Sequence, residues 1–219
     1  MRPGTVAVLA SGGLDSAILV AELAREGQDV QPIYVRFGLV WEEVEEAHLR
    51  RFLATLPAER VAPLLTLDFP IADVYQSHWS LSARGIPDAD SPDEAVYLPG
   101  RNLLLLAKAI VWCALHDVTA INLGTLKGNP FADASREFFA AVEQVAHIGL
   151  GAPIEIEMPF GTLTKADVLQ LGRDLQLQHT FSCIDPQGSQ HCGRCNKCAE
   201  RRRVFADLSI EDRTPYAGS

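Results

Sequence analysis

Short apolar runs alternate with longer amphipathic segments along most of the chain. The apolar runs have the length of buried strands and cover residues 5–10, 29–35, 61–69, 118–123 and 154–157. The amphipathic segments predict helices over residues 14–25, 42–56, 102–115, 135–147 and 164–175. This alternation predicts an α/β fold with a doubly wound, mostly parallel sheet and helices on both faces.

Sheets of this kind bind ligands at the carboxyl ends of their strands, where the chain order reverses. The loops that leave the predicted strands are therefore the expected place for chemistry. Residues 82–98 are rich in proline and acidic side chains and are expected to form a loop or lid, and residues 124–130 form a second loop. We place an α/β domain at residues 1–178 and a C-terminal segment with a terminal helix at residues 179–219.

The first predicted strand runs directly into Ser11-Gly12-Gly13-Leu14-Asp15-Ser16, which opens the first predicted helix. Two glycines let a backbone approach an anion closely, and the helix N-terminus offers free N–H groups and the positive end of its dipole. Asp15 can hold a Mg²⁺ ion that bridges phosphates. The loop is neither a Walker A motif nor a GxGxxG fingerprint. It predicts a phosphate site, and the alternative is a glycine-rich turn that binds nothing.

Four of the five cysteines are clustered near the C-terminus in the pattern C-x8-C-x2-C-x2-C, at Cys183, Cys192, Cys195 and Cys198. Thiolates at this spacing can converge on one ion, and four of them form a closed tetrahedral site, so we predict one structural Zn²⁺ per chain. An iron–sulfur cluster and free thiols are the alternatives. The fifth cysteine, Cys113, falls inside an apolar helix and is expected in the core.

The chain has 219 residues and a formal net charge of −9, which disfavours a general nucleic-acid binder. No apolar stretch is long enough to span a membrane, and the N-terminus lacks a signal peptide, so a cytoplasmic location is expected. The run Arg201-Arg202-Arg203 is expected on the solvated face of the terminal helix.

The chain resembles the 7-cyano-7-deazaguanine (preQ0) synthase family of PP-loop ATP pyrophosphatases. The resemblance rests on the SGGxDS loop, on Pro99-Gly100-Arg101-Asn102, on Thr164-Lys165-Ala166-Asp167 and on the C-G-x-C-x-x-C element of the cysteine cluster. It implies a Rossmann-like PP-loop fold and a ligase that converts 7-carboxy-7-deazaguanine, ammonia and ATP into a nitrile through two adenylated intermediates. It also allows a homodimer, which is common in this family.

The resemblance assigns roles to individual residues. ATP would be bound by the loop and its flanks, namely Leu9, Ala10, Ser11, Gly12, Gly13, Leu14, Asp15, Ser16 and Ala17. Asp15, Arg101 and Lys165 would be catalytic, with the two cations steadying phosphates or the substrate carboxylate. Solvated surface cations are the alternative reading of Arg101 and Lys165. Asn102, Asp133 and Glu137 would bind the substrate, because a guanine-like edge presents N–H donors that favour a carboxylate acceptor.

Two segments depart from the family pattern. Residues 37–41 read Phe-Gly-Leu-Val-Trp where the family carries Tyr-Gly-Gln-Arg-His, and residues 125–135 lack the family's cysteine and arginine. Both segments leave strand ends beside the ATP loop, so they bear on the substrate. The alternatives are a divergent ligase that joins a related acid to another amine, a tRNA sulfur transferase, and a nucleotide-binding module without catalysis. Sulfur transfer usually needs a reactive cysteine pair near ATP, and only Cys113 lies outside the cluster.

Overall fold

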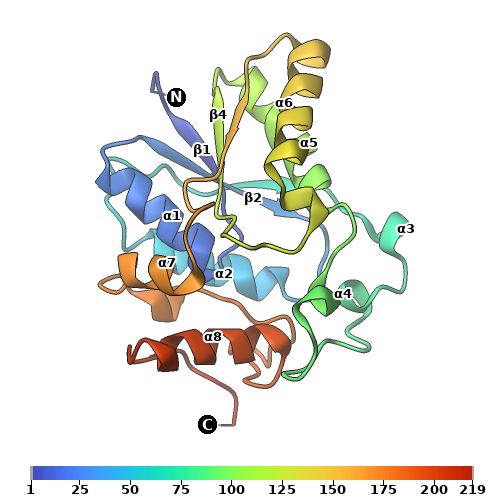
Figure 1. The fold of residues 1–219 in the computed structure, drawn as a ribbon, viewed down its shortest axis with the longest axis vertical. Coiled ribbons are helices and arrows are strands. Elements are labelled where there is room, and N and C mark those ends of the chain that lie inside the picture. Colours follow the sequence, from blue (N-terminus) through green and yellow to red (C-terminus); the bar gives the residue numbers. More distant parts are fainter. Residues whose placement is uncertain (1, 219) are drawn as a thin grey trace.

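Five parallel strands form one sheet within residues 2–218, the part of the chain that the computed structural model describes (Figure 1). The strands are β1 (Val6–Leu9), β2 (Val30–Arg36), β3 (Leu65–Asp68), β4 (Ala120–Leu123) and β5 (Glu155–Glu157), in the order β3-β2-β1-β4-β5. Because β1 pairs with both β2 and β4, the chain order reverses beside β1. The predicted doubly wound α/β fold is confirmed.

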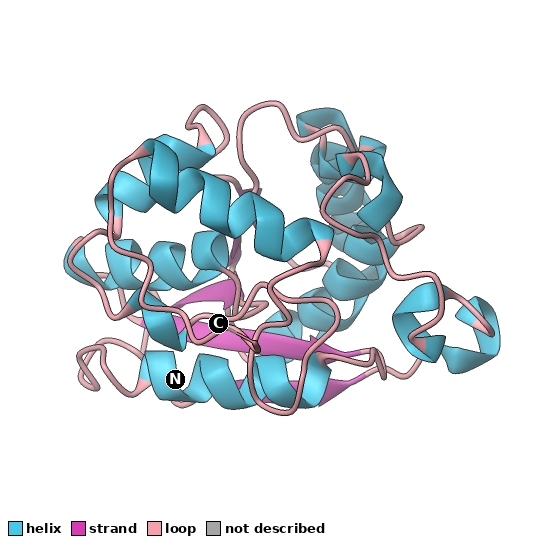
Figure 2. Ribbon diagram, turned by 90° about the horizontal axis from the view of Figure 1, so that it is seen from below, coloured by secondary structure: helices cyan, strands magenta, loops and turns pink. Residues whose placement is uncertain are grey.

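Helices cover both faces of the sheet (Figure 2). They are α1 (Leu14–Arg25), α2 (Glu42–Leu53), α3 (Ala72–Tyr75), α4 (Trp79–Ser82), α5 (Arg101–Leu115), α6 (Arg136–Leu150), α7 (Lys165–Leu171) and α8 (Asn196–Asp207). Successive strand residues point to opposite faces. Ala7 and Leu9 therefore pack with α5 and α6, whereas Val8 packs with α1, α2 and α7.

The C-terminal segment shares these two cores. Phe181 and Cys183 join the cluster under α5 and α6, and Val204 and Phe205 of α8 join the cluster under α1 and α7. Figure 1 shows α8 lying across the edge of the sheet at which β1 ends. The segment thus covers the edge where ligands of such sheets bind.

Several elements are shorter than the apolar pattern predicts. Residues 61–69 were expected as one strand, but β3 begins at Leu65, and Val61 forms only an isolated bridge with Val30. Pro63 lies between Val61 and Leu65 and has no N–H for a ladder hydrogen bond. The helix expected over residues 164–175 ends at Leu171. The next residue, Gly172, packs so closely on α1 that a Cβ atom there would lie 2.6 Å from Ile18.

The segment 82–98 is mostly irregular, as expected, but hydrogen bonds attach it to the C-terminal segment. It contains a 3-10 turn at Asp93–Val96 and follows two short helices, α3 and α4, that the sequence pattern does not predict. Asn196 donates from its backbone N–H to the Pro87 carbonyl (3.1 Å) and from its side chain to the Ser91 carbonyl (2.7 Å). These bonds anchor the acidic segment to the start of α8.

Arg201 corrects the expectation of a solvated arginine run. Arg202 and Arg203 are exposed, but the side chain of Arg201 is only 1% exposed. Its guanidinium donates to the Thr180 hydroxyl (2.8 Å), the Leu177 carbonyl (2.8 Å) and the Thr214 hydroxyl (2.9 Å). Arg201 thus joins the segment after α7 to the last turn of the chain. Among the described residues, no helix is both long and apolar enough to cross a membrane.

Candidate active site and metal centre

The loop between β1 and α1 has a geometry that requires its first glycine. Gly12 has a φ of +79°, and a Cβ atom there would lie 3.0 Å from Cγ and 3.2 Å from the carbonyl oxygen of Glu45. Gly13 caps α1 without any side-chain hydrogen bond, so the first N–H groups of the helix remain available to a ligand. The Ser11 N–H donates to the Ser16 hydroxyl over 3.1 Å, which closes the loop. This arrangement suits an anion at the start of α1.

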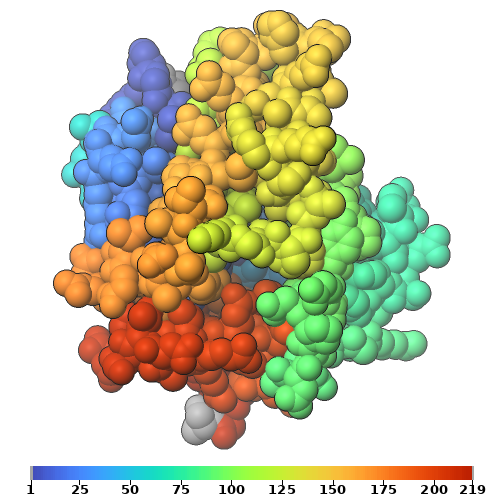
Figure 3. Space-filling view, viewed as in Figure 1, coloured from blue at the N-terminus to red at the C-terminus, as the bar shows by residue number. Residues whose placement is uncertain are grey.

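The loops that follow β1 and β4 meet at the reversal point of the sheet. A Cβ atom on Gly124, the residue after β4, would lie 3.0 Å from the Ser16 nitrogen. A cleft of about 490 Å³ opens there. Figure 3 shows its mouth between the segment after β4 (yellow-green), the C-terminal segment (red) and the segment before α5 (green).

The expected ATP-binding residues gather along this cleft, with two exceptions. Those that line it are Leu9, Ala10, Ser11, Gly13, Leu14, Asp15 and Ser16. Gly12 and Ala17 fall outside the described lining: Gly12 faces Glu45 of α2, and Ala17 is buried within α1. Both therefore support the loop from behind.

Asp15 and Lys165 form an ion pair at one end of the cleft. The Lys165 Nζ lies 2.7 Å from the Asp15 Oδ2. Lys165 is the first residue of α7, whose start is fixed by a capping box between Thr164 and Asp167. Burial lowers the pKa of Lys165, but the charges of Asp15 and Glu200 more than offset this, so its pKa is raised and its ammonium group stays charged.

Two further charged residues of this end come from α8. The sequence interpretation gave Lys197 only the role of offsetting the charge of the cysteine cluster, and it gave Glu200 no role. The Glu200 carboxylate lies 3.3 Å from the Lys165 Nζ and 2.7 Å from the Lys197 Nζ. Burial raises the pKa of Glu200, but the two ammonium groups outweigh burial and lower it to about 2. The signal that the sequence offered was their spacing of three residues, with Lys197 inside the cysteine pattern and Glu200 two residues after its last cysteine. Asp15, Lys165, Lys197 and Glu200 are called the charged end below.

Arg101 also lies on the cleft, as the first residue of α5. The preceding Gly100 has a φ of +71°, a conformation that favours glycine and turns the chain into the helix. The Arg101 Nε is buried and has no hydrogen-bond partner among the described residues. A buried, unpaired guanidinium N–H facing a cleft can bind an anionic ligand.

The expected substrate-binding residues are placed unequally. Asn102 and Asp133 line the cleft and bond to each other: the Asp133 carboxylate accepts from the Asn102 backbone N–H over 3.0 Å, and the Asn102 side chain donates to the Asp133 carbonyl over 2.9 Å. Asp133 thereby also caps the N-terminus of α5. Glu137 is exposed on α6 and lies outside the described lining of the cleft.

A buried carboxyl group lies beneath the glycine loop. Glu45 accepts a hydrogen bond of 2.6 Å from the Tyr34 hydroxyl, and both residues line the cleft. Burial raises the pKa of Glu45 to about 8, although the Tyr34 hydroxyl and the charge of Arg101 act in the opposite direction. The pKa of Glu42 is also raised by burial, which the N–H groups of Phe37 and Gly38 only partly offset. The sequence interpretation placed both glutamates in the acidic first turn of the helix over residues 42–56 and gave neither a role in the site.

Aromatic rings line the rest of the cleft as two stacked pairs. Trp41 and Trp79 have ring centroids 5.6 Å apart, and those of Tyr97 and Phe131 lie 5.1 Å apart. Trp41 and Phe131 belong to the two segments that depart from the family pattern. These four residues are called the ring end below. Aromatic rings of this kind can bind a planar heterocycle, which packs either with its face or with its edge against them.

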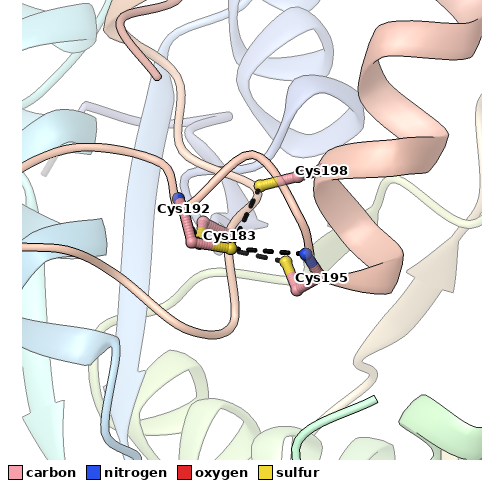
Figure 4. A group of neighbouring side chains, drawn as sticks. All are labelled: Cys183, Cys192, Cys195 and Cys198. Atoms are coloured by element: carbon pink, nitrogen blue, oxygen red, sulfur yellow. Dashed lines mark hydrogen bonds between the residues drawn. The ribbon is translucent and has the colours of Figure 1, made fainter. Parts of the chain in front are cut away.

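The four clustered cysteines are all buried, and their sulfur atoms lie within 4.8 Å of one another (Figure 4). Two of the sulfur–sulfur distances, Cys192 to Cys198 and Cys183 to Cys195, are 3.9 Å. A tetrahedral ion with metal–sulfur bonds of about 2.3 Å requires about 3.8 Å between sulfurs. Backbone N–H groups donate to Cys183 and Cys192, which favours thiolates. The cluster can therefore hold one metal ion.

Comparison with known proteins agrees with this geometry. The family model described as "Queuosine biosynthesis protein QueC" matches residues 5–209. A protein of Methanosphaerula palustris named 7-cyano-7-deazaguanine synthase is 31% identical over 95% of this chain and 97% of its own length. Proteins of the same name from Methanocaldococcus jannaschii and Rhodopirellula baltica are 27% and 30% identical, over 94% and 95% of this chain and 96% and 90% of their own lengths.

Two solved structures share the fold. One is a 4-thiouridine synthetase in complex with RNA and bound ATP, with a TM-score of 0.53 and 14% identity over 94% of this chain and 52% of that chain. The other, from Methanocaldococcus jannaschii, is described as a predicted subunit of tRNA methyltransferase and has a TM-score of 0.50 and 16% identity, over 76% of this chain and 73% of that chain. At these identities the likeness concerns the fold alone.

Proposed function

Because this chain belongs to the family of queuosine biosynthesis protein QueC, we propose that it is a ligase that forms carbon–nitrogen bonds. It converts 7-carboxy-7-deazaguanine, ammonia and ATP into 7-cyano-7-deazaguanine in queuosine biosynthesis. The observation that carries the proposal is that one cleft combines the glycine loop and its Asp15–Lys165 pair with Arg101 and the ring end. A nucleotide and a planar acid can therefore meet in one place.

The charged end binds the phosphates of ATP in this proposal. The free N–H groups at the start of α1 and the hydroxyls of Ser11 and Ser16 face the phosphates, and Lys165 supplies a fixed positive charge. The Asp15 Oδ1 is buried and has no hydrogen-bond partner among the described residues, so a Mg²⁺ ion fits there. When bound, Mg²⁺ neutralises phosphate charge.

The reaction uses two activations. An oxygen of the substrate carboxylate attacks the α-phosphate of ATP, pyrophosphate leaves, and ammonia then displaces AMP to give an amide. The amide oxygen attacks a second ATP in the same way, and loss of a proton and AMP leaves the nitrile. Each attack builds negative charge on the phosphates, which Lys165 stabilises from a fixed position. Arg101 holds the substrate acid near the nucleotide through its unpaired N–H.

The ring end binds the deazapurine base. Its planar bicyclic ring packs against the rings of Trp41, Trp79, Tyr97 and Phe131, and the cleft excludes water around it. Asp133 lies on the same lining and is our proposed acceptor for N–H donors of the base. Glu137, which is exposed on α6, has no part in this proposal.

The cysteine cluster holds one structural Zn²⁺ per chain in this proposal. Four thiolates leave no open position on the ion, so it shapes the C-terminal segment rather than taking part in the reaction. A homodimer and a cytoplasmic location, both expected from the sequence, belong to the same proposal. The six exposed apolar side chains of α5 and α6 are compatible with a dimer: Leu103, Val111, Leu115, Val145, Ile148 and Leu150.

The thiol outside the cluster argues against sulfur transfer. Cys113 is fully buried in the core of α5, and burial raises its pKa to about 12. It also lies outside the described lining of the cleft. A thiol that is neutral and inaccessible at physiological pH is a poor nucleophile.

The test is incubation of the purified chain with ATP, 7-carboxy-7-deazaguanine and ammonium. We expect release of AMP and a product that is lighter than the amide by one water, identified by mass spectrometry. Accumulation of the amide alone would favour the second candidate, a ligase that joins a related acid to another amine. The observation that favours this candidate is that Trp41 and Phe131, from the two segments that depart from the family pattern, line the cleft. No release of AMP with any carboxylate would contradict both.

A further inference from the structure

The four residues of the charged end come from three separate segments of the chain. Asp15 lies in the first turn of α1, Lys165 begins α7, and Lys197 and Glu200 lie on α8. Lys165 contacts both carboxylates, at 2.7 Å from Asp15 and 3.3 Å from Glu200. Glu200 uses its other oxygen for Lys197, at 2.7 Å. Glu200 is therefore the group that joins the two lysines.

The position of Glu200 is set by the cysteine cluster. The helix α8 starts directly after Cys195 and contains Cys198, and Lys197 stands between these two metal-type ligands. Lys197 and Glu200 are three residues apart, so they share one face of the helix. The same segment is bonded to the glycine loop, because the Phe181 N–H donates to the Gly12 carbonyl over 2.7 Å.

Fixed charges stabilise a reaction better than mobile ones. A lysine ammonium group sits on a flexible four-carbon stem, so holding it in one place costs rotamer entropy. Cations that are already fixed need no rearrangement when charge develops on a leaving group. In the described residues, Glu200 is the one ion-pair partner of Lys197 and the second partner of Lys165.

We propose that Glu200 is a positioning residue that holds Lys165 and Lys197 together at the charged end, so that two fixed ammonium groups face the departing pyrophosphate. Lys197 thereby becomes a second phosphate-facing cation. The cysteine cluster takes no part in the reaction itself, but it fixes the helix that carries both residues. The assignment of pyrophosphate to this end rests on the proposed function.

Replacement of Glu200 by glutamine separates positioning from simple attraction. The substitution removes a negative charge near the phosphates, so Coulomb attraction alone would leave ATP binding unchanged or make it tighter. Loss of positioning instead slows turnover, because the ammonium groups no longer lie in fixed places. A loosened C-terminal segment would weaken ATP binding and release the metal. The KM for ATP, the kcat and the metal content together therefore distinguish the three effects.

The experiment compares Glu200→Gln, Glu200→Asp and wild-type protein as the full metal-loaded chain. The matched control is Glu211→Gln, whose carboxylate pairs with Arg213 at 2.7 Å with both side chains 70% exposed. We expect Glu200→Gln to lower the kcat of AMP release at least tenfold, with a KM for ATP that is unchanged or lower and with full metal content. Glu200→Asp should recover part of the rate, and Glu211→Gln should match the wild type.

A second readout does not depend on activity. Reductive methylation with mass-spectrometric mapping reports how free each lysine is. Lys197 should be modified several-fold faster in Glu200→Gln than in wild type, Lys165 less so because Asp15 still holds it, and Lys108 on α5 should not change. A kcat within twofold of wild type, a rise in the KM for ATP, or unchanged labelling of Lys197 would overturn the inference. If the wild type releases no AMP, the proposed function fails and the labelling alone decides the inference.

Discussion

The charged end of the cleft is joined by ion pairs of 2.7 to 3.3 Å between three segments, whereas the ring end is built from stacked rings whose centroids lie 5.1 and 5.6 Å apart. Ion pairs need individual atoms in fixed places, and here a glycine loop, a capping box and a cysteine cluster fix them. Rings need only a surface of suitable shape. The difference suggests that the charged end serves chemistry common to the family and that the ring end adapts to the substrate.

Removal of the metal should break the charged end most completely. In Cys195→Ala the closed site loses one of its four thiolates, so we expect loss of the bound metal, lower soluble yield and a lower thermal midpoint. Structural zinc contributes about 10–16 kcal/mol to the folding of small zinc peptides, so the effect should exceed that of any single contact in the cleft. Elemental analysis and thermal unfolding measure the outcome.

The matched control for this prediction is Cys113→Ala, which removes a buried thiol of α5 outside the cluster. It should lose some stability but retain about one metal ion per chain. Full stability of Cys195→Ala would show that the cluster is not structural. Iron in the wild-type protein would favour the iron–sulfur alternative.

Substitution of Asp15 should break the charged end while leaving the fold intact. In Asp15→Ala, Lys165 loses the partner at 2.7 Å, and the Mg²⁺ proposed at Asp15 loses its ligand. Removal of one fixed electrostatic group from an active site typically costs about 10²–10³-fold in rate, and we expect at least that loss of AMP release. Asp73→Ala, at an exposed position of α3, serves as the control. Retention of more than a tenth of the wild-type rate would contradict the prediction.

Substitution of Trp41 should affect the ring end alone. Stacking of a base on an aromatic side chain is worth about 1–3 kcal/mol, which corresponds to about 10- to 100-fold in affinity. We therefore expect Trp41→Ala to raise the KM for the deazapurine by that factor and to leave the KM for ATP nearly unchanged. Trp112→Ala, whose ring stacks on His116 away from the cleft, should change neither value. An equal rise in both KM values would mean that the two ends are not separable.

The comparison also explains what the sequence could predict. The sheet, its helices and the glycine loop follow from local patterns: an apolar run, a capping box and a pair of glycines each specify structure within a few residues. Asp15 and Lys165 were singled out because they belong to short motifs. Their 2.7 Å contact across 150 positions was not predicted, because it depends on how α7 packs against α1.

Other parts of the site carry no local signal. Glu200 and Arg201 are neighbours in a charged helix and both line the cleft, but Glu200 pairs with two lysines whereas Arg201 is buried against Thr180 and Thr214. Helical periodicity alone does not say which face α8 buries, because its sequence is polar nearly all round. The ring end comes from segments outside the predicted helices and strands, so Trp79 and Tyr97 could not be assigned to it. Such contacts are decided by tertiary packing.

The smallest predicted effect concerns Glu45, which lines the same cleft but belongs to neither end. Its carboxyl group is buried behind Gly12 and faces Tyr34 of β2, Glu42 of its own helix and Arg101 of α5. Burial raises its pKa from the usual 4.5 to about 8. With this pKa the carboxyl group is mostly protonated at neutral pH, so Glu45 is an uncharged residue of the cleft lining and does not add a charge to the charged end.

Protonation of Glu45 makes the stability of the fold depend on pH. Below about pH 4.5 the group is protonated in both states, and between pH 4.5 and 8 the unfolded chain ionises while the folded chain keeps its proton. The folded state therefore binds more protons in this window, and the free energy of unfolding falls as pH rises. Each pKa unit corresponds to about 1.4 kcal/mol, so between pH 5.5 and 7.5 we expect wild type to lose about 1–3 kcal/mol relative to Glu45→Gln. Urea unfolding of both proteins at the two pH values measures this difference, and parallel curves would place an ionised Glu45 within the charged end.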